Sequence, residues 1–268
     1  MTLDAQLNYY VEMSGKPSVF IYKPSEQEKT RMPRYGLRDV VIHEGREHLS
    51  KLSLDEQGFV LTHHETGVGD LYDEGEVKRD YYPEMEALVA RVTGASRVVA
   101  FDHNVRCAEM AKRGVNNAQM PVLSPHNDYT DRSGPQRVRD LMGDEAESLL
   151  EGRFAVINVW KPIRGPVESS PLAMCDAASI GEDELVATDL VYRDRTGEVQ
   201  LLRYSPEQRW YYFSRMESNE ALLMKCFDSE RDGRARFTAH TAFEDPSSGP
   251  DAPARESIEV RTLAFFSA

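Results

Sequence analysis

The tripeptide His126-Asn127-Asp128 carries two side chains that suit a divalent metal ion. In an extended backbone, residues i and i+2 point to the same side, so the imidazole of His126 and the carboxylate of Asp128 can reach one ion. His240 lies in a later segment, 237–243, that is predicted to be a strand, and it is a candidate third ligand. Two histidines and one carboxylate on one face of an octahedral ion leave three positions open, the arrangement of non-haem Fe(II) oxygenases.

The tripeptide alone leaves a second interpretation open. Asn and Asp side chains commonly stabilise turns, so His126 could serve a hydrogen-bonded turn instead of a metal. The run His63-His64-Glu65 also offers a rival pairing of histidine with a carboxylate. Adjacent histidines on an extended chain point in opposite directions, however, so His63 and His64 cannot both serve one ion from the same side.

The segment 255–261, near the end of the chain, predicts a second polar group of residues. Read as a strand, it places Arg255, Ser257, Glu259 and Arg261 on one face and apolar side chains on the other. If that face points inward, it needs a polar occupant. The guanidinium of Arg255, with its two parallel N–H donors, and the hydroxyl of Ser257 can together hold a carboxylate. Arg261 is a rival for that anchoring role. An exposed edge strand with scattered charges is the alternative.

Five further residues are candidates for the cavity of such a site. Asn158 shares a predicted strand face with Trp160, so it is a candidate polar contact to a cofactor. Trp160, Trp210 and Tyr212 are candidate aromatic walls around a substrate, with packing in the core as the alternative for each. His103 is a candidate substrate contact, and a hydrogen-bonded structural histidine is the alternative there.

Composition narrows the class of protein. The 268 residues include 32 Lys+Arg and 45 Asp+Glu, and the net charge of −13 argues against binding to nucleic acid or to an anionic membrane surface. Three cysteines without a CxxC pair support neither a disulfide framework nor a thiolate zinc site. We find no apolar run long enough for a membrane helix, and residues 1–10 lack the order of a signal peptide, so we expect a cytoplasmic protein.

Periodicity predicts helices in the first part of the chain and strands in the second. Residues 83–94 and 135–150 predict amphipathic helices, and 96–103 predicts a buried strand. After Gly152, short strand patterns alternate with turn residues, in the segments 154–160, 185–192, 199–204, 210–213, 221–226, 237–243 and 257–266. We therefore expect a mainly β protein with helices (α+β), a double-stranded β-helix or cupin-like jelly roll buttressed by helices. Residues 1–268 should form a single domain, with an irregular N-terminal wrap over 1–54 and the jelly-roll core over 55–268.

Several blocks of sequence, taken in order, resemble one family of enzymes. These blocks are Phe101-Asp102-His103-Asn104-Val105-Arg106, Gly152 to Pro162, Pro171 to Asp176, Arg209-Trp210-Tyr211-Tyr212, Phe227-Asp228-Ser229, His240-Thr241-Ala242-Phe243 and Arg255 to Arg261. The family is that of the Fe(II)/2-oxoglutarate-dependent enzymes that include the hydroxylase component of cephalosporin methoxylation, gibberellin-desaturase-like proteins and fungal natural-product hydroxylases. At the position of Lys161, relatives often carry arginine.

The resemblance implies an oxidoreductase, a dioxygenase that uses Fe(II), 2-oxoglutarate and O₂ and releases succinate and CO₂. It implies His126, Asp128 and His240 as iron ligands, and Arg255 with Ser257 as the 2-oxoglutarate anchor. The expected substrate is a small specialised metabolite that is hydroxylated, desaturated, or cyclised or rearranged. No nucleic-acid or membrane partner is expected, and a homodimer is considered. Two alternatives remain, a cupin-like metal enzyme without 2-oxoglutarate and a non-catalytic barrel protein.

Overall fold

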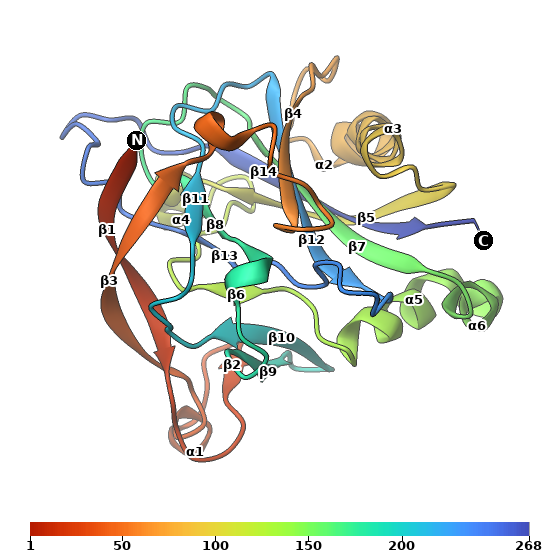
Figure 1. The fold of residues 1–268 in the computed structure, drawn as a ribbon, viewed down its shortest axis with the longest axis horizontal. Coiled ribbons are helices and arrows are strands. Elements are labelled where there is room, and N and C mark those ends of the chain that lie inside the picture. Colours follow the sequence, from red (N-terminus) through yellow and green to blue (C-terminus); the bar gives the residue numbers. More distant parts are fainter. Residues whose placement is uncertain (268) are drawn as a thin grey trace.

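A fully buried strand, β7 (Phe154–Pro162), lies in the middle of the smaller of two β-sheets in the computed structural model, which describes residues 1–267 (Figure 1). Alternate side chains of this strand enter different cores. Val156 and Trp160 belong to the core between the two sheets, whereas Ile157 and Val159 belong to a second core on the outer face of the smaller sheet. A strand that is apolar on both faces has to be covered on both sides, which explains its central position.

The smaller sheet has five strands in the order β4-β12-β7-β14-β5, and the larger has nine in the order β1-β3-β11-β8-β13-β6-β10-β9-β2. Besides β7, the strands are β1 (Thr2–Val11), β2 (Ser18–Phe20), β3 (Arg34–Glu44), β4 (Phe59–His63), β5 (Arg97–Arg106), β6 (His126–Asn127), β8 (Leu172–Cys175), β9 (Leu185–Val191), β10 (Thr196–Leu202), β11 (Trp210–Tyr212), β12 (Glu220–Asp228), β13 (His240–Ala242) and β14 (Ser257–Phe265). Most neighbouring strands are antiparallel, while β11 runs parallel to β3 and β2 runs parallel to β9. Two curled, facing sheets are the predicted jelly-roll architecture.

The helices cover the outside of this framework. They are α1 (Glu26–Lys29), α2 (Glu74–Glu76), α3 (Tyr82–Thr93), α4 (Ala108–Arg113), α5 (Ser133–Met142) and α6 (Ala146–Leu150), with short helical turns η1 (Gly45–His48), η2 (Val77–Tyr81), η3 (Gly143–Glu145) and η4 (Ala177–Ser179). Within residues 1–267, no helix is both long and apolar enough to cross a membrane.

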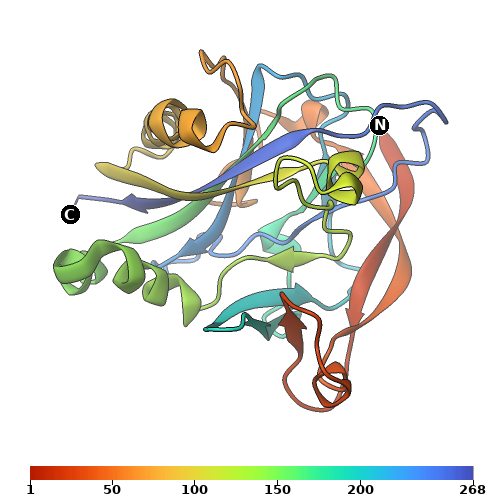
Figure 2. The same ribbon diagram turned by 180° about the vertical axis from the view of Figure 1, so that it is seen from behind.

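Helix α3 confirms the prediction for residues 83–94. Pro83 lies in its first turn, where no intrahelical N–H partner is lost, and Gly94 ends it with a left-handed φ of 73°. Met85, Leu88 and Val89 are buried and pack in the outer core of the smaller sheet. Figure 2 shows α3 lying across this sheet, as a buttressing helix should.

Two other predictions for this part of the chain need correction. The single helix predicted over 135–150 is divided into α5 and α6, because the backbone at Gly143 leaves the helical region with φ 54°. The strand predicted over 96–103 is present as β5, but it is an edge strand with mostly half-exposed side chains and not a buried one.

The irregular N-terminal wrap predicted over residues 1–54 is wrong. β1 and β3 pair in antiparallel register from Thr2 opposite His43 to Val11 opposite Arg34, and this ribbon lies along one side of the molecule (Figure 1). Ala5, Leu7 and Tyr9 alternate with Asp4, Gln6 and Asn8, so only one face of β1 is apolar and packs on the larger sheet. This period of two was visible in the sequence and outweighs the prolines that predicted an irregular segment.

Lys161, on the outward face of β7, is a buried cation. Its Nζ donates to the backbone carbonyl of His64 and lies 3.3 Å from His64 Nδ1. Burial lowers the pKa of Lys161 to about 8, although the Glu84 carboxylate opposes this effect. The folded state therefore disfavours the charged amine.

This depressed pKa predicts a pH-dependent difference between the wild type and Lys161→Met. Between about pH 8 and the pKa of about 10.4 for an exposed lysine, the unfolded chain holds a proton that the folded chain has released. The wild type should therefore gain stability relative to the variant as pH rises, by up to about 1.4 kcal/mol per pH unit. Denaturant unfolding of both proteins at pH 7, 8, 9 and 10 measures this, and a constant difference would contradict it.

Candidate active site

Three side chains converge between the two sheets. His126 and His240 lie directly opposite each other on the neighbouring strands β6 and β13, and their ring centroids are 4.5 Å apart. His126 Nε2 lies 3.6 Å from Asp128 Oδ1. One ligand atom from each of His126, Asp128 and His240 lies within 4.8 Å of the others, a spacing that fits a single metal ion. The structure thus brings together the three residues that the sequence predicted as a set.

Both imidazoles are oriented by the backbone. Nδ1 of His126 lies 2.9 Å from the carbonyl oxygen of Ser124, and Nδ1 of His240 lies 3.2 Å from that of Thr238. A carbonyl can only accept, so each Nδ1 carries the proton and each Nε2 keeps a free lone pair. Burial lowers the pKa of His126 to about 4 and also lowers the pKa of His240, which keeps both rings neutral. Neutral imidazoles with a free Nε2 are the form that binds metal.

Asn127, between the first two candidate ligands, ties their strand to its surroundings. Its side chain is fully buried, and its Nδ2 contacts the carbonyl oxygens of Tyr129 and Cys226 and the Oε1 of Gln200 at 2.7, 3.0 and 2.9 Å. Its Oδ1 accepts from the backbone N–H of Thr238 at 3.4 Å. Thr238 is also the residue whose carbonyl orients His240, so one amide connects the segments that carry all three candidate ligands.

Asp128 is held by one of its two oxygens. Arg261 Nε donates to Oδ2 at 3.0 Å, and Asn158 Nδ2 donates to the same oxygen at 2.9 Å. Burial alone would raise the pKa of Asp128, but the Arg261 guanidinium, together with the two neighbouring histidines and the Asn158 hydrogen bond, outweighs it and holds that pKa well below its usual range. The carboxylate is therefore ionised, with Oδ1 on the side of His126.

The polar face predicted on β14 does point inward. Ser257 and Glu259 are buried on this strand, Arg261 is partly buried on it, and Arg255 is buried just before the strand begins. Arg255 Nη1 donates to the carbonyl of Ser170 at 2.6 Å, and its guanidinium lies 5.5 Å from the ring centroid of Trp160. Its buried Nε has no hydrogen-bond partner among residues 1–267. Burial, and then the neighbouring Arg106, lower the pKa of Arg255 to about 9, although the Glu259 carboxylate opposes this effect.

One small cavity unites these groups. Its volume is about 20 Å³, close to the space of one water molecule. It is lined by Arg106, His126, Trp160, His240, Arg255 and Glu259, together with Val122, Leu172, Thr241 and Ala242. Of the three predicted aromatic walls, Trp160 does line this cavity. The cavity lies where the metal ligands and the candidate carboxylate anchor meet.

Arg106 is a functional candidate that the sequence analysis missed. It lies at the end of β5 directly opposite Ser257, so it shares the inward face of β14. Its Nη1 donates to the carbonyl of Met120 at 2.8 Å, and it forms no ion pair with a side chain in the described part of the chain. The block 101–106 contained the signal, because alternate residues of a strand next to β14 must share its inner face.

Trp210 and Tyr212 do not line the cavity, and the prediction that they form its walls is wrong. They lie opposite Cys175 and Ala173 on β8, whereas His240 lies opposite Met174, so they point to the other face of the larger sheet. There Trp210 is fully buried and donates from Nε1 to the hydroxyl of Tyr9 at 2.7 Å. Both aromatic side chains belong to the core beneath the β1–β3 ribbon.

His103 is also outside the cavity. It lies opposite Val260 on β14, on the face away from Glu259 and Arg261, and its Nδ1 is 2.9 Å from the hydroxyl of Tyr82 in α3. The prediction of a substrate contact is therefore wrong for this residue, and the alternative of a hydrogen-bonded structural histidine describes it. His64, from the rival run His63-His64-Glu65, contacts Lys161 instead of the candidate metal ligands.

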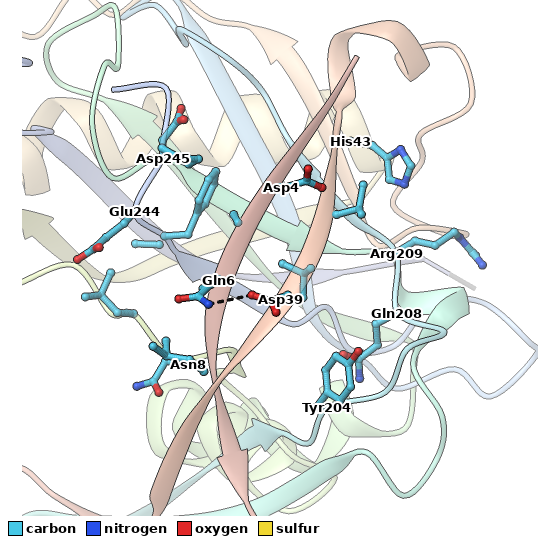
Figure 3. A pocket seen from close by; sticks show the side chains of 18 of the residues that line it. Asp4, Gln6, Asn8, Asp39, His43, Tyr204, Gln208, Arg209, Glu244 and Asp245 are labelled. Carbon is cyan, nitrogen blue, oxygen red and sulfur yellow. Dashed lines mark hydrogen bonds between the residues drawn. The ribbon is translucent and has the colours of Figure 1, made fainter. Parts of the chain in front are cut away.

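A much larger hollow lies elsewhere. It has a volume of about 1490 Å³ and runs along β1 and β3 beside the segments 204–209 and 242–248. Figure 3 shows Gln6 and Asp39 hydrogen-bonded across the two strands, with Glu244 and Asp245 among the other lining residues. His126, Asp128 and His240 are not among its lining residues, so its size does not mark the site of chemistry.

Comparisons with known proteins identify the relatives of this chain. A family model described as an oxidoreductase/YMDC permease-like domain matches residues 7–265. The hydroxylase/desaturase efuI of Hormonema carpetanum is 33% identical, and the match covers 99% of this chain and 95% of that protein. The alpha-ketoglutarate-dependent dioxygenase phiK of a fungal species is 34% identical over 80% of this chain and 79% of that protein.

A solved structure extends the agreement to the fold. The iron and alpha-ketoglutarate-dependent endoperoxidase NvfI superimposes with a TM-score of 0.91 at 29% identity, and covers 100% of this chain and 99% of that one. Both the architecture and the cofactor class predicted from the sequence are confirmed by these similarities. The chain belongs to the family of Fe(II)/2-oxoglutarate-dependent oxygenases, enzymes that use iron, 2-oxoglutarate and O₂.

Proposed function

We propose that His126, Asp128 and His240 hold the iron of this oxygenase, and that Arg255 with Ser257 holds the distal carboxylate of 2-oxoglutarate. The donor set supports the metal assignment, because two neutral imidazole nitrogens and one ionised carboxylate oxygen lie within 4.8 Å of one another. This set leaves three positions of an octahedral ion free. When bound, the iron supplies the oxidative step that couples decarboxylation of 2-oxoglutarate to attack on a substrate C–H bond.

The observation that carries the assignment of the anchor is the buried Nε of Arg255, which has no partner among residues 1–267. An unpaired buried cation is costly, and Arg106 adds a second guanidinium to the same cavity. The dianion 2-oxoglutarate would neutralise both. Arg261 is not free for this role, because its Nε, Nη1 and Nη2 donate to Asp128, Asp102 and Glu259. The assignment therefore favours Arg255 over its rival.

The protein's own residues then position and shield the reactants. Trp160 lies against the Arg255 guanidinium and forms an apolar wall of the cavity, which helps to exclude water. With a volume of about 20 Å³, the cavity must widen to admit 2-oxoglutarate. Binding is therefore coupled to movement of the surrounding side chains.

We propose a small specialised metabolite as substrate. The names of the relatives, which include hydroxylase/desaturase and endoperoxidase, support this proposal. Hydroxylation, desaturation, and oxidative cyclisation or rearrangement all begin with removal of a substrate hydrogen, so one site can serve each outcome. The position of the substrate relative to the metal would select among them.

The proposal also includes the state of the protein in the cell, a single oxygenase domain in the cytoplasm without a nucleic-acid partner. The net charge of −13 supports the absence of nucleic-acid binding. A homodimer is part of the proposal, since Leu37 and Val41 are exposed apolar side chains on the outer face of β3. Light scattering of the purified protein measures its oligomeric state directly.

The experiment that tests the site is anaerobic addition of Fe(II) and 2-oxoglutarate to the wild type and to His126→Ala. We expect the weak visible charge-transfer band of chelated iron in the wild type and its loss in the variant. A band in both proteins would remove His126 from the metal site. Absence of a band in both would contradict the proposed function and favour a metal enzyme without 2-oxoglutarate or a non-catalytic barrel.

A further inference from the structure

Two residues that the sequence suggested as cofactor contacts are instead directed at a metal ligand. Asn158 on β7 and Arg261 on β14 lie directly opposite each other in the smaller sheet. From this pair of positions, both side chains reach across the interior to the same atom, Asp128 Oδ2, at 2.9 and 3.0 Å. Asp128 Oδ1 receives no protein hydrogen bond among the described residues and lies 3.6 Å from His126 Nε2.

A carboxylate can bind a metal ion through one oxygen or through both. If Asp128 used both, it would occupy two positions of an octahedral ion, and only two would remain for other ligands. An oxygen that already accepts two strong hydrogen bonds, one of them from a guanidinium, is a poor second ligand. The pair of donors therefore favours binding through Oδ1 alone.

We propose that Arg261 and Asn158 are positioning residues that hold Asp128 as a one-oxygen ligand and so keep three positions of the metal open. This inference rests on the proposed function, since it assumes that Asp128 binds the iron. Neither residue touches the metal or the co-substrate in this role. Both act through the carboxylate of Asp128.

The surroundings of Arg261 show how its orientation is kept. Its Nη2 donates to Glu259 Oε1 at 3.2 Å, and its Nη1 donates to Asp102 Oδ2 at 2.9 Å. Asn158 Nδ2 also approaches Glu259 Oε1, at 3.4 Å. Glu259 thus accepts from both positioning residues, and the three acidic groups around Arg261 leave its guanidinium no freedom to turn toward the cavity.

The test uses Co(II) in place of iron, because the visible spectrum of Co(II) reports its coordination and no turnover is needed. We compare the wild type with two variants. Asn158→Leu removes the amide donor at similar volume, and Arg261→Lys keeps the positive charge but removes the planar guanidinium with its several N–H donors. Arg153→Lys is the matched control, since Arg153 forms a two-bond pair with Asp228 at the far end of β7. Thermal unfolding of each metal-free protein records its stability separately.

We expect Asn158→Leu and Arg261→Lys each to weaken Co(II) binding by about 10- to 100-fold and to change the Co(II) absorption spectrum. Arg153→Lys should leave both measurements at the wild-type value, even where it lowers thermal stability. Wild-type affinity and an unchanged spectrum in folded Asn158→Leu and Arg261→Lys would overturn the inference. That result is expected if Asn158 and Arg261 contribute only to the stability of the fold.

Different results would contradict the proposed function and the positioning role of Arg261 and Asn158. A wild type that binds Co(II) without binding 2-oxoglutarate would contradict the proposed function, and the two variants would still decide the role of Arg261 and Asn158. A wild type that binds no Co(II) would overturn the metal site and this inference together. Arg261→Lys should also keep the wild-type preference for 2-oxoglutarate over 2-oxopentanoate, which lacks the distal carboxylate. Loss of that preference would make Arg261 the anchor and overturn the inference.

Discussion

Turnover is expected to fall by at least about 1000-fold when Asp128 is replaced by asparagine, a loss of about 4 kcal/mol in transition-state stabilisation. The reason lies in the donors around this side chain. Arg261 and Asn158 both donate hydrogen bonds, so they would select the carbonyl oxygen of the new amide and turn its nitrogen toward His126. An amide nitrogen has no lone pair to give to a metal. Asparagine would therefore fill the position of Asp128 and still remove the ligand.

Steady-state turnover and Fe(II) affinity of Asp128→Asn, measured with any accepted substrate or by uncoupled consumption of 2-oxoglutarate, test this expectation. Asp131→Asn is the control, because Asp131 lies nearby in sequence but pairs with Arg231 and Arg236 instead of facing the metal site. A variant at Asp128 that kept wild-type iron affinity would show that this side chain is not a ligand.

Replacing Arg255 with leucine is expected to abolish the preference for 2-oxoglutarate over 2-oxopentanoate. The two compounds share the keto acid group that chelates the metal, and only 2-oxoglutarate carries the distal carboxylate. A two-pronged contact between that carboxylate and the buried guanidinium should contribute about 3 kcal/mol, which is about 100-fold in affinity. The affinity for 2-oxopentanoate should hardly fall, because its chain ends in a methyl group that offers the Arg255 guanidinium no oxygen to bind.

Titration of the anaerobic Fe(II) protein with each keto acid, followed by the charge-transfer band, measures both affinities in the wild type and in Arg255→Leu. The carbonyl of Ser170 loses its donor in this variant, so thermal unfolding should accompany the titration. An unchanged preference for 2-oxoglutarate in a folded variant would exclude Arg255 as the anchor and make Arg106, the other guanidinium of the cavity, the candidate.

Part of the candidate metal site could be predicted because two of its residues follow the alternation of an extended chain. His126 and Asp128 are two residues apart, and extended chain geometry places such residues on one side without any knowledge of the fold. The same rule correctly predicted the inward face of β14 and the shared face of Asn158 and Trp160. What the rule could not supply was the identity of the atom each side chain contacts.

Arg261 illustrates that limit. The alternation of side chains along the strand predicted that Arg261 lies on the inner face. Whether its guanidinium contacts a co-substrate or Asp128 depends on how closely β14 and β6, which are distant in sequence, approach each other. That approach is set by the register of β14 with β7 and by the position of β6, neither of which is a local property of the sequence. Arg106 could not be predicted for the same reason, because its position opposite Ser257 depends on the register of β5 with β14.

Trp210 and Tyr212 show a second limit. Alternation states that they share a face, but it does not state which face is inside. The β1–β3 ribbon creates an additional core on the outer side of the larger sheet, and that core takes up both aromatic side chains. The ribbon itself was predicted as an irregular segment, so a second core on that side of the sheet was not expected.

The alternation along β14 has a consequence for how this protein can change over evolutionary time. Arg255, Ser257, Glu259 and Arg261 occupy alternate positions, and β14 is paired on both sides, with β7 and β5. A one-residue insertion or deletion between positions 257 and 261 would turn part of this set into the outer core, where Ile258 and Val260 now lie. The segment 245–254 before the strand has no such constraint. We therefore expect natural length variation among related proteins to accumulate in that segment and to be absent from β14.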